Sequence, residues 1–336
     1  MNFSKPKCKY VIGIICCASL IFLSYTAGCA TKAMPYSPPE RTAWLVYWDA
    51  QNGLGESSAS AKKYTSVSYF AAYFNEQDAL FIPDGFQDEK AILKQNGFKP
   101  QYEYLTVVND VAGTSKNSFK DINVVKRVLD GDAKRILHAH EIIELAQTYH
   151  CNGIDLDYEQ IFKDPAAADD YIKFIKILYE KASLHNIKLR VILEPSVKFS
   201  NYEFPKGPQY IVMLYNLYGL HSGPGPKADF SFIEATAERM KALPAPIGVA
   251  LSTGGCIWGD DGKKKFISGQ EAKALAQENH VAQKRDEKSD DLYFSFKKDN
   301  VNYTVWYADQ DTIESWEKKA AAMGLHSVSI WRLGNS

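Results

Sequence analysis

The sequence predicts an α/β fold from two observations: short β-rich runs alternate with segments of helical period, and the runs number eight. Strand–helix alternation produces parallel sheets covered by helices, and eight parallel strands close a TIM (β/α)8 barrel. The composition of the 336 residues, 46% hydrophobic and 24% charged, is that of a folded globular protein. The expected strands are residues 42–49, 66–74, 102–109, 153–159, 188–194, 210–216, 247–251 and 327–333.

Helical segments fall between these strands. In residues 133–149, apolar side chains from Ile136 to Ala146 recur at i, i+3 and i+4 spacing, which predicts an amphipathic helix. Residues 166–183, 230–243 and 312–323 are predicted helices too. After the seventh strand, residues 255–302 form a long polar insertion, for which we expect a small helix at 270–279 and a two-stranded patch. No clear eighth helix follows the last strand.

The N-terminal segment is predicted to be an export signal. Lys5, Lys7 and Lys9 precede the apolar run 10–22, which is short for a bilayer span and typical of a signal peptide. The sequence before Cys29 resembles the lipobox of bacterial lipoproteins. We therefore expect a signal peptide at residues 1–28, lipidation of Cys29, a tether at 29–40 and a barrel at 41–336. The product would be an exported lipoprotein of the bacterial cell envelope, anchored to the membrane by lipid. Plain secretion and an uncleaved anchor are the alternatives.

Charge and cysteine counts narrow the function further. Lys and Arg total 39 against 40 for Asp and Glu, and this balance argues against nucleic-acid binding. Once the signal and Cys29 are set aside, Cys151 and Cys256 remain. The predicted topology puts them near opposite ends of the barrel, about 17 Å apart. A disulfide needs Cα atoms within about 7 Å, so we expect two free thiols.

Three acidic residues mark the fourth predicted strand, residues 153–159. Because side chains alternate along a strand, Asp155, Asp157 and Glu159 share the face that points to the barrel axis. Burial of three like charges is costly, and the crowding should raise the pKa of at least one carboxyl group and so supply a proton donor near neutral pH. Glu159 comes last, at the end where TIM barrels hold their active sites. It is the candidate acid.

The segment 153–159 resembles the DGxDxDxE signature of family 18 glycoside hydrolases, with Asn152 in place of the first Asp. Met213, Tyr215 and Asn216 resemble the family's sixth strand, and the segment around Trp331 resembles its last strand. The similarity spans residues 42–334. Within the family, the moderate insertion is more similar to compact bacterial enzymes of spore-cortex and cell-wall lysis than to processive chitinases.

This resemblance implies retaining, substrate-assisted hydrolysis of β-1,4 bonds next to N-acetylglucosamine, in peptidoglycan or chitin-type glycans. Glu159 would protonate the glycosidic oxygen, Asp157 would orient the substrate's acetamido group, and Asp155 would share a proton with Asp157. Tyr215 would donate a hydrogen bond to the acetamido carbonyl, and Trp331 would stack on the sugar. The binding residues would be Trp331, Asn216 and Met213, although Met213 also fits a packing role. No cofactor or metal is implied.

Several alternatives stay open. His138 and His140 could suggest a metal pair, but i and i+2 residues of a helix do not face each other. Glu194 could line the cleft or hold a loop. The fold also serves as a non-catalytic, lectin-like carbohydrate-binding protein, or as a purely structural lipoprotein. The natural glycan, endo or exo action, the oligomeric state and the effect of Asn152 on activity are not determined by the sequence.

Overall fold

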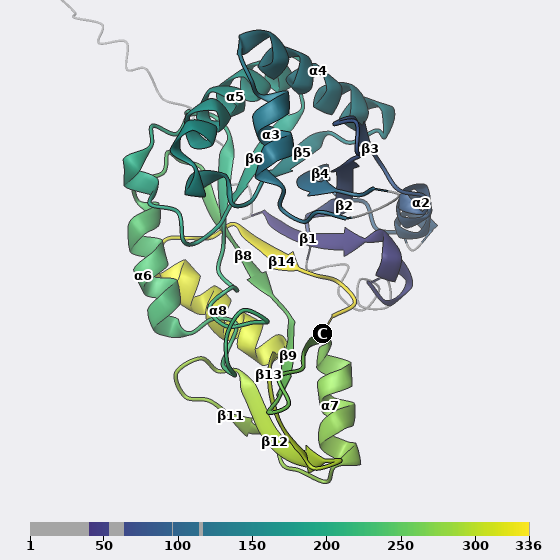
Figure 1. Cartoon of the computed structure of the whole chain (residues 1–336), viewed down its shortest axis with the longest axis vertical. Helices are drawn as coiled ribbons and strands as arrows, with labels where there is room; N and C mark the ends of the chain where they lie inside the picture. The colour runs from purple at the N-terminus through teal and green to yellow at the C-terminus, as the bar shows by residue number, and fades with distance from the viewer. Residues whose placement is uncertain (1–39, 54–63, 96, 114–116, 336) are drawn as a thin grey trace, which may run out of the picture. The chain divides into compact units, whose positions relative to one another are not determined.

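The structure, a computed structural model, describes residues 40–53, 64–95, 97–113 and 117–335. Its main sheet contains the predicted closed barrel of eight parallel strands (Figure 1). Strand β1 pairs with β2 and so closes the ring, and the short antiparallel strand β3 (Leu80–Phe81) extends β2. Around the barrel the order is β1 (Arg41–Val46), β14 (Val328–Trp331), β8 (Ile247–Ser252), β7 (Gln209–Met213), β6 (Lys188–Leu193), β5 (Gly153–Asp157), β4 (Tyr102–Val111) and β2 (Ser66–Phe74).

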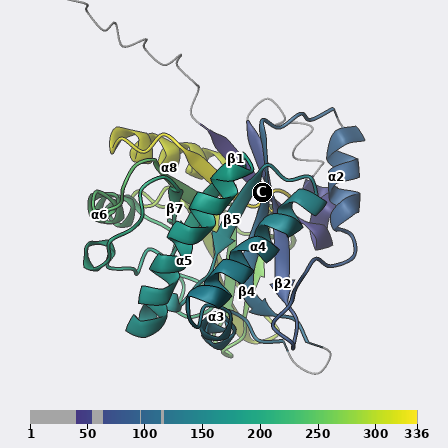
Figure 2. The ribbon, with the colours of Figure 1, turned by 90° about the horizontal axis from the view of Figure 1, so that it is seen from above.

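Helices cover the outside of the barrel. The four predicted helices correspond to α4 (Asp132–Thr148), α5 (Pro165–Leu184), α6 (Phe230–Met240) and α8 (Gln310–Ala322). Figure 2 shows α4 and α5 side by side across β4 and β5. Two further helices, α2 (Phe86–Gln95) and α3 (Ile122–Val128), were not predicted, and both are short. Between β6 and β7 the described chain forms a 3-10 turn, η3 (Phe199–Asn201), in place of a longer helix. In the described residues up to 335, no helix follows β14.

Several helix starts are fixed by side-chain caps. The Asp164 carboxylate accepts hydrogen bonds from the first amides of α5, where Pro165 occupies the first turn. Asp229 and Asp309 cap α6 and α8 in the same way. Each cap satisfies backbone donors that a helix leaves unpaired. The caps therefore fix where the chain turns from the loops at the site into the outer helices.

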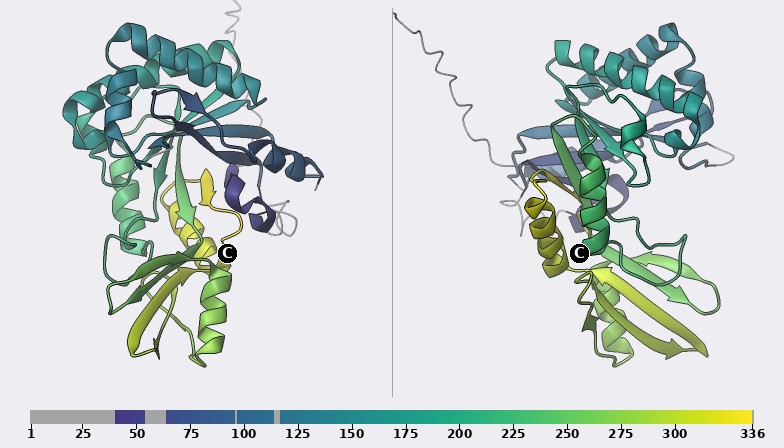
Figure 3. Two further views of the ribbon diagram at one scale, coloured as in Figure 1. Left: turned by 45° about the vertical axis from the view of Figure 1, so that its right-hand side comes forward. Right: turned by 90° about the vertical axis from the view of Figure 1, so that its left-hand side faces the viewer.

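The insertion after β8 is larger in structure than predicted. It forms a five-stranded antiparallel sheet in the order β10-β9-β13-β12-β11, flanked by α7 (Gly269–Glu278) (Figure 3). Its strands are β9 (Gly254–Gly259), β10 (Lys264–Ile267), β11 (Lys284–Arg285), β12 (Leu292–Lys298) and β13 (Val301–Ala308). The predicted two-stranded patch was wrong because β9 is glycine-rich and pairs with the distant β13. A Cβ at Gly255 would lie 1.8 Å from the Trp306 carbonyl oxygen, so this approach of the two strands requires glycine.

The thiol prediction is confirmed for the described residues. Cys151 precedes β5 and Cys256 lies in β9, and both are buried and free. The predicted signal peptide, Cys29 and nearly all of the tether lie outside the described residues. In the part of the chain that is described, no helix is both long and apolar enough to cross a membrane.

Candidate active site

Strand β5 presents the acidic row as its alternation predicts. Ile154, Leu156 and Tyr158 are buried in the core between barrel and helices, so the three acids occupy the opposite face. Asp155 is fully buried within the barrel. Asp157 is the last residue of β5, and Glu159 follows in the loop beyond it. The row therefore runs from the barrel interior to the face formed by the carboxyl ends of the strands.

The deepest acid is bound to an arginine. Arg190 of β6 donates from Nε to Asp155 Oδ1 at 2.6 Å and from Nη2 to Oδ2 at 2.7 Å. Ser68 Oγ donates to the same carboxylate at 2.5 Å, and Arg190 Nη1 donates to Thr42 Oγ1 at 2.6 Å. A bidentate guanidinium stabilises the ionised carboxylate. Arg190 of β6 therefore supplies the counter-charge for Asp155, and the sharing of a proton between Asp155 and Asp157 stays a prediction.

Asp157 has a different environment. Its Oδ1 is buried and has no hydrogen-bond partner among the described residues. Burial raises its pKa well above the ordinary value, and the negative charges of Glu159 and Asp155 raise it further, against the effect of Lys120. Burial therefore favours the neutral form of Asp157.

Glu159 lies at the opening of the barrel and is paired with a lysine. Lys120 Nζ lies 2.5 Å from Glu159 Oε2. The Asn109 side chain fixes the backbone of Glu159, since it accepts from the N–H at 2.9 Å and donates to the carbonyl at 3.1 Å. Burial raises the pKa of Glu159, the Lys120 ammonium opposes this, and the charges of Glu194 and Asp110 add to the rise. The net shift is upward, which favours the protonated form that a general acid needs.

Glu194 forms the loop hydrogen bond that was one of its two open interpretations. Its Oε2 accepts from the Gln160 N–H at 2.6 Å, so it holds the loop that carries Glu159. Its charge also acts on the pKa of Glu159. Glu194 therefore borders the candidate acid and fixes the backbone beside it.

The predicted sugar-binding residues gather next to the acids. Tyr215 is close enough to Asp157 and Glu159 for their charges to raise its pKa, which burial raises most. Met213 is buried and packs with Tyr215 and Trp331, so it supports the site from below. Tyr215, Asn216 and Trp331 line one pocket, which we call the mouth pocket. We define it by six of its residues: Tyr215, Asn216, Tyr218, Lys227, Phe266 and Trp331.

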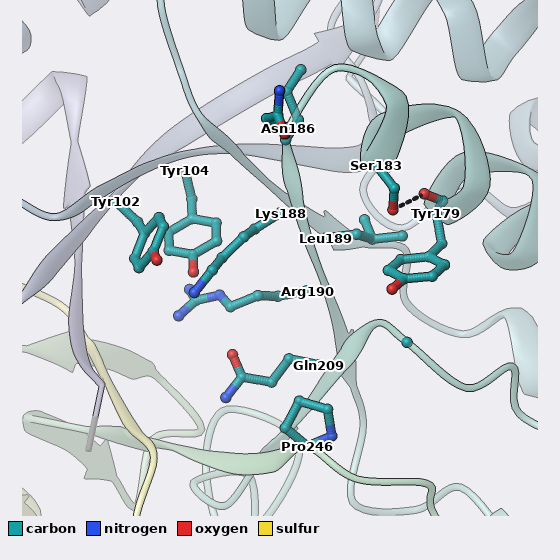
Figure 4. A pocket seen from close by; sticks show the side chains of 12 residues that line it. Tyr102, Tyr104, Tyr179, Ser183, Asn186, Lys188, Leu189, Arg190, Gln209 and Pro246 are labelled. Atoms are coloured by element: carbon teal, nitrogen blue, oxygen red, sulfur yellow. Dashed lines mark hydrogen bonds between the residues drawn. The ribbon is translucent and has the colours of Figure 1, made fainter. Parts of the chain in front are cut away.

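Another pocket lies at the opposite end of the barrel. It is lined at the amino ends of β4, β6 and β7, where Lys188 lies over the ring of Tyr102, 3.5 Å from its centroid (Figure 4). The Arg190 guanidinium lies over Tyr104 at 4.0 Å. Active sites of TIM barrels lie at the carboxyl ends of the strands, and the amino ends serve stability. The mouth pocket and the acidic row are therefore the candidate active site.

The histidine pair on α4 does not form a metal site. His138 is buried, and its Nε2 lies 2.7 Å from the Tyr158 hydroxyl. His140 is exposed and contacts Lys181. No group of three or more potential metal ligands occurs among the described residues. His138 is a core residue that supports the back of β5.

The whole barrel matches a known family. Residues 43–336 match Glycosyl hydrolases family 18. The chain belongs to this family and is a glycoside hydrolase. An uncharacterized glycosylase of Bacillus subtilis, YvbX, is 24% identical over 309 residues, which cover 84% of this chain and 87% of that protein.

Two solved structures illustrate the shared family 18 fold. The spore cortex-lytic enzyme SleL of Bacillus megaterium superposes with a TM-score of 0.72 at 18% identity, covering 90% of this chain and 72% of SleL. A chitinase of Chromobacterium violaceum superposes with a TM-score of 0.73 at 19% identity, covering 89% of this chain and 95% of that one. At these identities the likeness concerns the fold.

Sequence reasoning missed the basic and amide partners of the acids in this family 18 barrel. Lys120 and Asn109 come from β4 and the loop after it, and Arg190 was counted only as part of a β-rich run. A charged residue inside an otherwise apolar strand was the available signal for Arg190, since a buried charge needs a partner. Lys120 carried no such signal, because it lies in a loop.

Proposed function

We propose that the enzyme hydrolyses β-1,4 bonds next to N-acetylglucosamine by a retaining, substrate-assisted mechanism, in peptidoglycan or chitin-type glycans. The observation that carries the proposal is that Asp157 and Glu159 lie together at the open end of the barrel, close to Tyr215, and that burial raises the pKa of both carboxyl groups. No second carboxylate is needed as a nucleophile, because the substrate's own acetamido oxygen serves.

In the first step Glu159 gives its proton to the glycosidic oxygen and the bond from C1 to that oxygen breaks. The acetamido oxygen forms a bond to C1 and yields an oxazolinium ion. Asp157 accepts a hydrogen bond from the acetamido N–H and stabilises the positive charge, and Tyr215 donates to the acetamido oxygen.

In the second step the Glu159 carboxylate removes a proton from water, and the water oxygen attacks C1. The bond from C1 to the acetamido oxygen breaks, which restores the N-acetyl group with net retention at C1. Trp331 offers an apolar face to the sugar. It is held from behind by Phe70, with ring centroids 4.8 Å apart, and by Trp44 at 6.1 Å.

The test is Glu159→Gln. The variant keeps the shape of the acid without its proton, so we expect a loss of at least ~100-fold in the release of reducing ends from N-acetylglucosamine oligomers, with binding retained. The matched control is Glu103→Gln, which changes another lysine-paired glutamate, 2.8 Å from Lys90 at the amino end of β4. It should retain most activity. Saturable binding by the unmodified enzyme without turnover on any such glycan would contradict the proposal and favour a lectin.

We also propose that the enzyme works outside the cytoplasm as a lipoprotein attached through Cys29. This part rests on the sequence of residues 1–29, where three lysines, an apolar run and small residues precede the cysteine. Such a location would bring the barrel next to cell-wall glycans.

A further inference from the structure

The mouth pocket contains a cation, Lys227, that forms no ion pair among the described residues. Lys227, in the loop before α6, donates from Nζ to Ser252 Oγ at 2.8 Å and to the Thr253 carbonyl at 3.1 Å. Within the described parts of the chain, Lys227 forms no ion pair with a carboxylate. An ammonium has three donors, so one N–H is available for a further partner.

Asp291 and Arg332 are the charged neighbours of Lys227, and Asp291 acts on its ammonium from beyond ion-pairing distance. Asp291 accepts from the Lys227 backbone N–H at 3.2 Å; it is fully buried, and burial raises its pKa well above the ordinary value, against the effect of Lys227. Arg332 also borders the pocket, and its guanidinium is already bound to Asp49 Oδ2 at 2.6 Å. Burial lowers the pKa of Lys227 to about 8, which leaves it mostly charged at neutral pH.

The rest of the pocket has the character of a sugar site. Trp331 and Tyr215 line this pocket and belong to one apolar cluster, and Tyr215 lies close enough to Asp157 and Glu159 for their charges to raise its pKa. Tyr218 and, in the inserted sheet, Phe266 also line the pocket. These two residues are 38% and 57% exposed. Aromatic faces of this kind stack on the apolar faces of sugar rings. The pocket therefore continues the proposed substrate cleft from the reacting sugar toward Lys227.

We propose that the mouth pocket is a subsite for a sugar that carries a carboxylate, and that Lys227 is the group that binds it. This inference rests on the proposed function and deepens it. A neutral sugar would leave the half-buried ammonium without a counter-charge, whereas a carboxylate would form a charge-assisted hydrogen bond. In peptidoglycan strands without stem peptides the matching group is the lactyl carboxylate of muramic acid, which becomes an amide where a peptide is attached, and chitin has none. Lys227 would thus select for carboxylated glycans.

The experiment compares three substrates: peptide-free peptidoglycan glycan strands, the same strands after methyl esterification of their carboxylates, and chitin oligomers. We expect Lys227→Met to lower the ratio of kcat/KM on free strands to kcat/KM on esterified strands by about tenfold or more. Lys227→Arg should restore most of the ratio because it keeps the charge. Intact strands with stem peptides distinguish the lactyl carboxylate from peptide carboxylates, since only the latter would bind better in them.

The matched control is Lys263→Met, which removes an exposed lysine from the turn between β9 and β10, where it pairs with Asp261 at 2.9 Å. It should leave the ratio as it is, and thermal denaturation checks that each variant folds. Equal losses on free and esterified strands for Lys227→Met would overturn the subsite while hydrolysis stands. The converse case, a subsite without hydrolysis, is tested by measuring how free and esterified strands bind to the Glu159→Gln variant, with and without Lys227→Met. If no glycan is hydrolysed but ester-sensitive binding still depends on Lys227, the subsite stands and the proposed reaction fails.

Discussion

Two acids of the row form ion pairs, and these pairs differ in burial, in the elements that carry them and in the number of hydrogen bonds. At the barrel floor, Asp155 and Arg190 both lie on strands, and their side chains are 0% and 1% exposed. At the barrel mouth, Glu159 follows the end of β5, and Lys120, which reaches it from a loop, has a side chain that is 38% exposed. The floor pair is bidentate and has further hydrogen bonds, whereas the mouth pair has one contact.

The buried pair serves stability and the partly exposed pair serves reactivity, although their acids are only a few residues apart in the chain. A buried, fully bonded pair holds its charges in fixed states, and removal of one partner is very costly. A partly exposed lysine can leave a carboxylate when substrate arrives, and its departure raises the pKa of the acid at the moment the acid must hold a proton. Asp157 lies between the two pairs without a hydrogen bond to its Oδ1 in the described structure, and burial raises its pKa well above the ordinary value.

The largest effect on stability should follow from Arg190→Met. The change leaves the Asp155 carboxylate buried with Ser68 as its remaining donor, and we expect the free energy of unfolding to fall by about 3–5 kcal/mol. Chemical denaturation measures this. The double variant with Asp155→Leu should recover much of the loss, because it removes the uncompensated charge.

The matched control for the floor is Arg127→Met. Arg127 also binds an aspartate in bidentate fashion, at 2.6 and 2.7 Å from Asp78, but on the exposed surface. We expect a loss of about 1 kcal/mol or less. A similar loss for both single variants would show that burial is not what distinguishes the floor pair.

A smaller, pH-dependent effect should follow from Lys120→Met at the mouth. The Lys120 ammonium lowers the pKa of Glu159, so its removal lets burial raise that pKa further. A general acid is active below its pKa, and kcat/KM falls as pH rises through it. The alkaline limb of the kcat/KM profile should therefore move to higher pH, with a severalfold gain at pH 8 relative to pH 6.

Lys126→Met is the control for this shift, since Lys126 also pairs with a carboxylate, that of Asp164, away from the site. Its pH profile should match that of the unmodified enzyme. If the alkaline limb of Lys120→Met stays in place, the titration of Glu159 does not determine that limb. The Glu159–Lys120 pair would then have no demonstrated role in reactivity.

The predictable part of this site is what lies on strands. The period of two along β5 predicted which acids share a face, and the ends of β7 and β14 brought Tyr215 and Trp331 to the same opening. Loop residues such as Lys120 and the extent of the inserted sheet were not predictable, because both depend on pairing between distant segments, as β9 with β13. The bond of Asp155 to Arg190 likewise needs the order of neighbouring strands, β5 beside β6.

The smallest effect should come from Asn152→Asp, which introduces the acid found at the start of the family signature. Asn152 is exposed at the amino end of β5, where its Oδ1 accepts from the Glu103 N–H at 2.7 Å and its Nδ2 donates to the Gln101 carbonyl at 3.3 Å. An aspartate keeps the acceptor and loses the donor. Five residues of strand, about 16 Å, separate it from Asp157, which is beyond the screening length of about 8 Å at physiological salt. We expect kcat/KM to stay within about twofold and the pH profile to stay in place. A displaced pH profile would show that a charge at residue 152 changes the pKa of the carboxyl groups at the barrel mouth.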